Sequence, residues 1–148
     1  MANHVFRELR ERYARGLIDL QTADWRALLV GVDSTVLGDK GVEFISQIAT
    51  LDETDAAGYA RQVLAGVAVT IDATNDLVKV DATDPTFGAL GYATKPIKGM
   101  LLYIHAGADS ANRVGVWIDT VSSGVRFPYT TTGATVSVVF DAGGFLNL

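Results

Sequence analysis

His105 is the first residue at which the sequence could hold a reaction centre. It follows an apolar run at residues 100–104, and Asp109 and Ser110 stand shortly after it. A serine-type hydrolase needs a nucleophile, a histidine and an orienting carboxylate. Here the serine and the aspartate lie in a short polar connector and do not match the nucleophile-elbow pattern. The sequence therefore favours His105 as a residue at the end of a strand, with no catalytic role.

Four aspartates close together form a second group that could do chemistry, in this case calcium binding. They are Asp72, Asp76, Asp81 and Asp84. A calcium loop of the EF-hand type requires glycine at its sixth position and glutamate at its twelfth, where this sequence has Leu77 and Thr83. A β-hairpin that turns at residues 73–76 explains the same aspartates, because carboxylates stabilise turns. We therefore expect no metal site here.

Most other reaction chemistries lack their residues in this sequence. The chain contains no cysteine, which excludes disulfides, thiolate catalysis and zinc–thiolate sites. It also has no glycine-rich phosphate loop and no dinucleotide-binding fingerprint. Paired carboxylates for glycoside cleavage leave no spacing signal, and Trp25 and Trp117 lie in apolar runs typical of a core rather than of a sugar cleft. We expect a protein without enzyme activity, cofactor or metal.

Composition and charge restrict the partners of the chain. Its 148 residues, 49% hydrophobic and 20% charged, fit one domain with a real core. Fifteen glycines indicate many turns. A formal net charge of −5 argues against nucleic acid as a partner. No apolar run approaches the length that spans a bilayer, so we expect no membrane association.

The N-terminal segment is predicted to be helical over residues 5–16. Val5 or Phe6, Leu9 and Tyr13 recur at helical spacing, Asn3 is placed to cap the start, and Gly16 to end it. The charges of residues 1–15 sum to +2. Because the net charge of the whole chain is −5, the remaining residues carry a net charge of −7. The narrow apolar stripe must lie on its own domain or on a neighbouring subunit.

We take the subunit contact as the hypothesis for this segment, with an exposed, solvated helix as the alternative. The hypothesis treats residues 1–16 as a helical arm and residues 17–148 as a single β domain. Removing residues 1–15 should then abolish assembly while the β domain still folds. The candidate assembly contacts in the arm are Phe6, Arg7, Leu9, Arg10 and Tyr13.

Short strands separated by turn signals fill the rest of the chain. The predicted strands cover residues 24–32, 76–82, 97–106, 113–120 and 134–141. Residues 59–72 form two strands broken near Gly66 or one long bent strand, residues 42–48 a short helical turn, and residues 143–148 a last edge strand. We therefore predict a mainly β fold, an antiparallel β-sandwich or barrel-like domain with a short N-terminal α-helix.

Phe127, Pro128 and Tyr129 form the second candidate contact. Two aromatic residues around a proline fit an exposed contact patch, and they fit equally well an edge strand that the proline interrupts. Both interpretations stay open, and Phe127 and Tyr129 join the candidate assembly contacts.

Several stretches of the chain follow a familiar pattern. They are ANHVF at residues 2–6, GLIDLQTADWRALLV at residues 16–30 and the closing segment at residues 98–148. In the closing segment a strand ends at a tyrosine, a small polar connector follows, the next strand ends in Ile-Asp, and a short apolar tail finishes the chain. In these features the chain resembles a family of small virion proteins of tailed bacteriophages. Residues 33–41 and 127–133 depart from that pattern.

The resemblance implies a structural role in a phage particle. It implies a capsid decoration or minor capsid protein, made in the bacterial cytoplasm, that is located in the virion. The implied partners are other copies of the chain in a homo-oligomer and other virion proteins, either the major capsid protein or tail proteins. The alternatives are a tail or baseplate component that binds a receptor or glycan through Phe127 and Tyr129, and an enzyme that acts on the host envelope.

Overall fold

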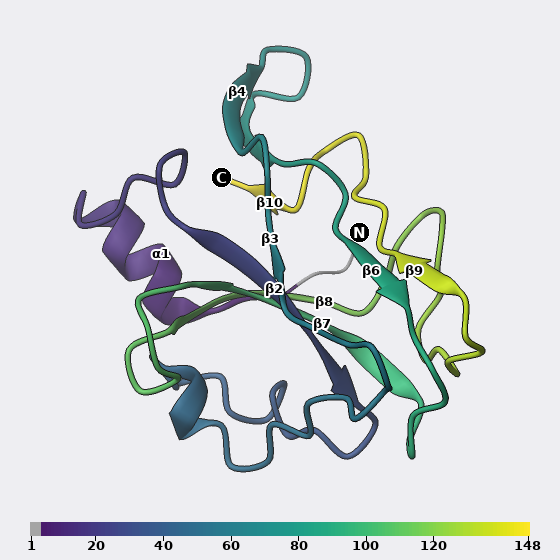
Figure 1. Cartoon of the computed structure of the whole chain (residues 1–148). Helices are drawn as coiled ribbons and strands as arrows, with labels where there is room; N and C mark the ends of the chain where they lie inside the picture. The colour runs from purple at the N-terminus through teal and green to yellow at the C-terminus, as the bar shows by residue number, and fades with distance from the viewer. Residues whose placement is uncertain (1–3) are drawn as a thin grey trace.

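The fold is mainly β, as predicted, in a computed structural model that describes residues 4–148 (Figure 1). Strands make up 34% and helices 8%, all strand pairs are antiparallel, and one short α-helix stands near the N-terminus. Within the described residues the sheets do not close into a barrel, and their layered arrangement is compatible with a sandwich.

A five-stranded sheet occupies the middle of the molecule. Its order is β1-β8-β7-β2-β3, and β2 pairs with β7 along its whole length. Its three inner strands are buried at nearly every position, which explains why they appear in the sequence as continuous apolar runs. The strand bounds are β1 His4–Val5, β2 Trp25–Gly31, β3 Gln62–Val63, β7 Ile97–Ile104 and β8 Arg113–Ile118.

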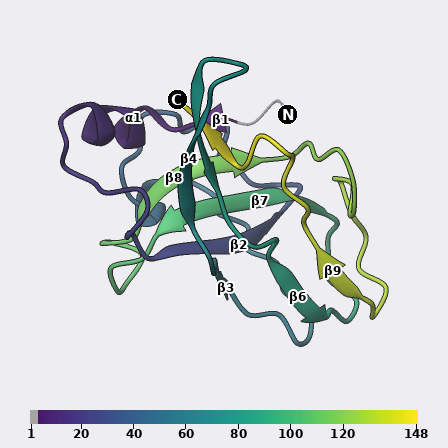
Figure 2. The same cartoon turned by 90° about the horizontal axis from the view of Figure 1, so that it is seen from above.

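Two smaller sheets lie over one face of the large one (Figure 2). One has the order β10-β5-β4, with β4 Ala68–Asp72, β5 Leu77–Asp81 and β10 Leu146–Asn147. The other pairs β6 Thr86–Ala89 with β9 Thr135–Ser137. Residues 59–72 thus form two strands, separated where Gly66 adopts a φ of 65° that favours glycine. The β4–β5 hairpin projects away from the rest of the molecule in both views.

The N-terminal helix, α1 Arg7–Ala14, ends at Gly16 as the sequence predicts. Gly16 has a φ of 65°, and its N–H donates to the carbonyl of Tyr13, which satisfies the end of the helix. Phe6 stands at the N-cap without a side-chain cap, and Asn3, the predicted cap, lies outside the described residues. The short helical turn predicted near residue 45 is the 3-10 helix η1 Ile45–Gln47.

Both faces of the large sheet are covered. Alternate residues of each inner strand belong to opposite faces, so Ala27 and Leu29 join one hydrophobic cluster while Leu28 and Val30 join the other. The first cluster fills the space between the large sheet and the two small ones. The second lies under the segment that contains η1. The molecule therefore has three layers with the five-stranded sheet in the centre.

The two tryptophans, expected in the core, are fully buried, one in each cluster. Each packs against a glycine of another strand. A Cβ added at Gly99 would lie 2.5 Å from Cζ2 of Trp117, and one added at Gly115 would lie 2.6 Å from Cζ3 of Trp25. These glycines leave the volume that the indole rings occupy.

Candidate functional site

His105 follows β7 and does not form a triad with its neighbours in sequence. Its backbone N–H donates to the carbonyl of Asp24 at 2.8 Å, and its ring lies edge-on to Tyr103 with centroids 6.4 Å apart. Its Nδ1 is buried and has no hydrogen-bond partner among residues 4–148. Asp109 instead accepts hydrogen bonds from Arg61 and Asn112. The strand-end position expected for His105 is therefore confirmed.

Arg61 is the centre of the most extensive polar cluster. Its guanidinium donates two bonds to Glu53, at 2.8 and 2.7 Å, and two to Asp109, at 2.6 and 2.9 Å. It also lies 5.4 Å from the centre of the Tyr103 ring. The Tyr59 hydroxyl donates to Glu53 at 2.8 Å and accepts the N–H of Leu29 at 3.0 Å. We call Arg61, Glu53, Asp109 and Tyr59 the Arg61 cluster.

The charges in the Arg61 cluster stabilise one another. The hydrogen bonds from Arg61 hold the pKa of Asp109 below its usual value. Hydrogen bonds to Glu53 and then to Asp109 raise the pKa of Arg61. Burial, with the neighbouring Glu53 charge, raises the pKa of the Tyr59 hydroxyl, which keeps it neutral. The cluster therefore joins the segment before β3, which contains residues 53, 59 and 61, to the connector between β7 and β8.

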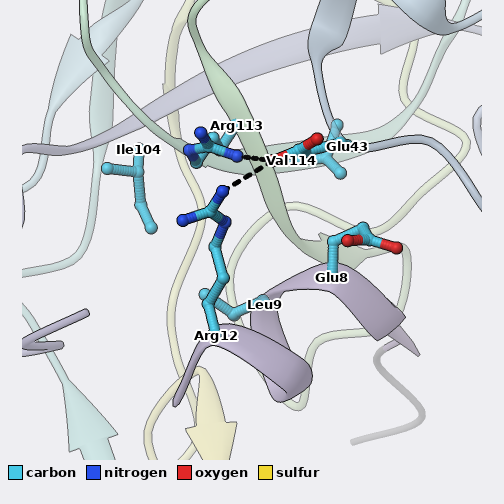
Figure 3. A pocket seen from close by; sticks show the side chains of 7 residues that line it. All are labelled: Glu8, Leu9, Arg12, Glu43, Ile104, Arg113 and Val114. Carbon is cyan, nitrogen blue, oxygen red and sulfur yellow. Dashed lines mark hydrogen bonds and ion pairs between the residues drawn. The ribbon is translucent and has the colours of Figure 1, made fainter. Parts of the chain in front are cut away.

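A second cluster joins the helix to β8 (Figure 3). Arg12 of α1 and Arg113 of β8 both bond to the same carboxylate oxygen of Glu43, Arg12 at 2.8 Å. The Arg113 guanidinium also lies 4.7 Å from the centre of the Phe44 ring. Burial, and then the nearby Arg12 charge, lowers the pKa of Arg113. The space lined by these side chains is too small to admit a water molecule, so we interpret the cluster as a clamp rather than a ligand site.

The candidate contacts in the N-terminal segment fall into two groups. Phe6 and Leu9 are buried in the chain's own clusters, at 0% and 3% exposure, so they do not offer their side chains to a neighbour. This corrects the expectation that they form subunit contacts, because the apolar stripe of α1 packs on its own domain. Arg7, Arg10 and Tyr13 are exposed and stay available for an assembly contact.

The described part of the predicted arm belongs to the same core as the β domain. β1 pairs with β8, at His4 with Trp117 and Val5 with Val116, and α1 packs against β8. Burial, with the charges of Lys40 and Arg10, lowers the pKa of His4, whose ring contacts Phe6 edge-on. Residues 4–16 are therefore held on the β domain by strand pairing, by packing and by the contact of Arg12 with Glu43.

Phe127 and Tyr129 lie outside the named strands, in a segment that meets β7 through a single bridge at Tyr129, so both interpretations stay open. The backbone of Tyr129 exchanges two hydrogen bonds with Ile97, at 2.7 and 2.8 Å, as an edge segment would. Both aromatic rings are half-buried against the first cluster. Beside Phe127 lies an open groove of about 340 Å³, whose lining also includes Pro128 and Lys98.

Asp72 stabilises the turn of the β4–β5 hairpin, as the hairpin interpretation predicts, whereas Asp84 accepts the backbone N–H of Phe140 at 2.7 Å. Asp72 accepts the backbone N–H groups of Thr74 and Asn75 at 3.1 and 3.2 Å, and pairs with Lys79 at 3.0 Å. The bond from the Asn75 side chain, with Lys79, lowers the pKa of Asp72 to about 2. Across residues 4–148 there is no group of three or more side chains arranged to hold a metal ion.

The β4 strand exposes apolar side chains at the edge of its sheet. It stands at the edge of its sheet, with β5 on one side and no described strand on the other. Ile71 is 82% exposed, while Ala68 and Thr70 on the opposite face are also exposed. We call residues 68–72, with their free backbone side, the β4 edge. The sequence predicted a strand that ends at residue 72 but could not show that one side of it would stay unpaired.

No helix within residues 4–148 has the length and apolar character needed to cross a bilayer. Comparison of the chain with protein-family models, with curated proteins and with solved structures finds no match.

Proposed function

We propose that this chain is a structural protein of a bacteriophage particle, a capsid decoration or minor capsid protein that acts by binding neighbouring subunits. The observation that carries the proposal is the projecting β4–β5 hairpin with its unpaired β4 edge. An exposed strand edge is a template for pairing with another chain. The virion setting comes from the resemblance carried by residues 2–6, 16–30 and 98–148.

Repetition makes a small contact sufficient in this role. A five-residue strand presents far less surface than a stable interface between two free proteins, which buries about 1,600 Å². On a shell, each copy is held by several neighbours, and the second contact of a tethered copy benefits from a high effective concentration. Weak pairing at the β4 edge can therefore contribute to firm attachment when many copies are present.

The test is the composition of purified phage particles. We expect quantitative mass spectrometry to find the chain in many copies per particle, and electron microscopy to locate it on the capsid. Ile71→Lys should reduce its incorporation severalfold, because it places a charge on the β4 edge. Tyr92→Lys is the matched control, since Tyr92 is 81% exposed but lies outside the hairpin. Particles that lack the chain while infected cells contain it would overturn the proposal.

The groove beside Phe127 favours a second candidate, a tail or baseplate component that binds a receptor or glycan. An open groove of about 340 Å³ with a half-buried aromatic ring and a lysine is suited to a sugar ring. Microscopy that locates the chain on the tail, and binding to host cell-wall glycans that Phe127→Ala abolishes in a folded variant, would support this candidate in place of the first.

A further inference from the structure

We propose that the β4 edge pairs with the β4 edge of a second copy of this chain, antiparallel and related by a two-fold axis at Thr70. The inference deepens the proposed function, on which it rests for its biological setting, by naming the partner of this edge. Three observations about the strand support it. Free backbone N–H and C=O groups point away from β5, no residue of the strand blocks pairing at this edge, and two copies of the strand match each other in an antiparallel register.

The backbone groups that the β4 edge offers can be identified from the far side of β5. Val78 exchanges two hydrogen bonds with Leu148, at 3.0 and 2.9 Å, and Val80 accepts one from Phe145 at 3.0 Å. In an antiparallel ladder alternate residues bond to opposite sides. Leu77, Lys79 and Asp81 therefore bond to β4, through their partners Asp72, Thr70 and Ala68.

It follows that Val69 and Ile71 direct their N–H and C=O groups away from β5, into the free side of the strand. These are two donors and two acceptors spaced as a partner strand requires. Both residues are β-branched, a type that favours the extended conformation. The strand therefore has the extended conformation and the free hydrogen-bonding groups that pairing with another strand requires.

Nothing along the strand prevents such pairing. Proteins protect free edges with prolines, bulges or charged side chains. Residues 68–72 contain no proline, and β4 pairs with β5 without a register shift. The one charge is Asp72 at the end of the strand, where Lys79 and Asn75 already bond to it.

A second copy fits this edge because the strand complements itself. An antiparallel register centred on Thr70 is the only one that pairs all five residues of β4. It places Val69 of each copy opposite Ile71 of the other copy. These two pairs use both free N–H groups and both free C=O groups of each strand. The exposed side chain of Ile71 then lies beside Val69 of the other copy, on one face.

On the other face the same register sets Thr70 against Thr70 of the second copy, a favourable cross-strand pair. Asp72 lies opposite Ala68, so no two like charges face each other. A partner strand of a different protein would need to supply this match separately, whereas a second copy contains it already.

Cross-linking through a single cysteine tests the register directly, because the chain has no cysteine of its own. At the two-fold axis the Cα atoms of Thr70 would lie about 4.5 Å apart, within the range of a disulfide. Ala68 is the matched control: it is exposed on the same face, but its Cα atoms in the two copies would lie about 14 Å apart.

We expect Thr70→Cys to form a disulfide dimer under mild oxidation at least ten times faster than Ala68→Cys. A mixture of Ala68→Cys and Asp72→Cys should form the mixed dimer, since these positions face each other in the register. Equal rates for Thr70→Cys and Ala68→Cys, in variants with unchanged circular dichroism, would overturn the proposal.

Proline at Val69 tests the pairing in the otherwise native chain. The Val69 N–H has no acceptor among residues 4–148, so Val69→Pro should preserve the hairpin while it removes a donor from the β4 edge. We expect the wild-type sedimentation coefficient to rise with concentration and that of Val69→Pro to stay at the monomer value. Ile71→Lys serves the same purpose if the proline variant does not fold.

The outcome for the dimer and the outcome for the proposed function are separable. A wild-type chain that sediments as a monomer at every concentration, together with an unreactive Thr70→Cys, would overturn self-pairing. The same chain found in purified particles would leave the structural role intact. Conversely, a dimer in solution with no chain in particles would support the pairing and overturn the virion role.

Discussion

Each tryptophan packs closely against a single residue, a glycine of another strand. Because Gly99 has no room for a Cβ beside Trp117 and the carbonyl of Ile118, we expect Gly99→Ala to destabilise the fold. Overpacking of this kind costs about 1–3 kcal/mol in the free energy of unfolding. Urea denaturation measures the loss.

Gly88→Ala is the matched control for that substitution. Gly88 also lies within a strand, but a Cβ there would meet no atom within 4 Å. Its free energy of unfolding should change by less than about 0.5 kcal/mol. Equal effects at both positions would show that the contact with Trp117 is not what makes glycine necessary at residue 99.

The Arg61 cluster makes the free energy of unfolding depend on pH. A pKa of Asp109 that is lower in the folded chain means that the unfolded chain binds the proton more readily. The stabilisation is therefore complete above about pH 4, the usual pKa of aspartate, and is lost as the pH falls through the folded value. Because Asp109 is 35% exposed, solvent screens the pair, and we expect Asp109→Asn to cost about 1 kcal/mol at pH 7.

Denaturation at pH 7 and below pH 4 checks this prediction. The difference between wild type and Asp109→Asn should shrink in acid, because both chains then lack the charge. Asp76→Asn, in the exposed hairpin turn where asparagine also accepts a positive φ, should have little effect on stability at pH 7. A difference that stays constant with pH would contradict the assigned role of Asp109.

This cluster could not be predicted from the sequence. Arg61 stands 8 positions from Glu53 and 48 from Asp109, so no local spacing links the three. Asp109 could be considered only beside its neighbours His105 and Ser110, and the tertiary fold directs it elsewhere. Residues that meet only in the fold leave no periodic signal in the chain.

At the scale of elements, apolar runs predict the long inner strands well. The runs at residues 97–106 and 113–120 predict β7 and β8 to within two residues at each end. The spacing of Leu9 and Tyr13 likewise predicts α1. The same spacing could not tell which surface the helix covers, because a narrow apolar stripe fits an intramolecular or an intermolecular partner equally well.

The structure reverses one consequence drawn from α1. Removal of residues 1–15 would expose the core that Phe6 and Leu9 fill, so it tests folding as well as assembly. We expect Phe6→Ala alone to cost about 3–5 kcal/mol in the free energy of unfolding, the usual effect of deleting a buried aromatic ring. Chemical denaturation gives this value.

Tyr13→Ala provides the comparison on the same helix. Tyr13 is 41% exposed, so its loss should cost much less than that of Phe6. If both substitutions had equally small effects, α1 would not be part of the folding core, and its role as a separate arm would be restored.

At the scale of the whole molecule, the central sheet makes the three layers unfold together. Each inner strand contributes alternate residues to both hydrophobic clusters, so neither cluster can be lost while the other keeps its strands. We expect one cooperative transition. Trp25→Phe and Trp117→Phe each leave a single fluorescent reporter, in opposite clusters.

In each variant the fluorescence midpoint in urea should coincide with the midpoint from far-ultraviolet circular dichroism. The variants will differ in overall stability, so the comparison is made within each one. Fluorescence that changes before circular dichroism in either variant would indicate that one layer opens independently.

The tryptophan–glycine contacts also limit how this sequence can drift over evolutionary time. Since each indole fills the volume that a larger residue at the facing glycine would need, Gly99 can change only together with Trp117, and Gly115 only together with Trp25. Distant homologues that lack one of these glycines should therefore also lack the tryptophan that faces it. Two coupled pairs of positions thus provide a signature of kinship that can outlast overall sequence identity.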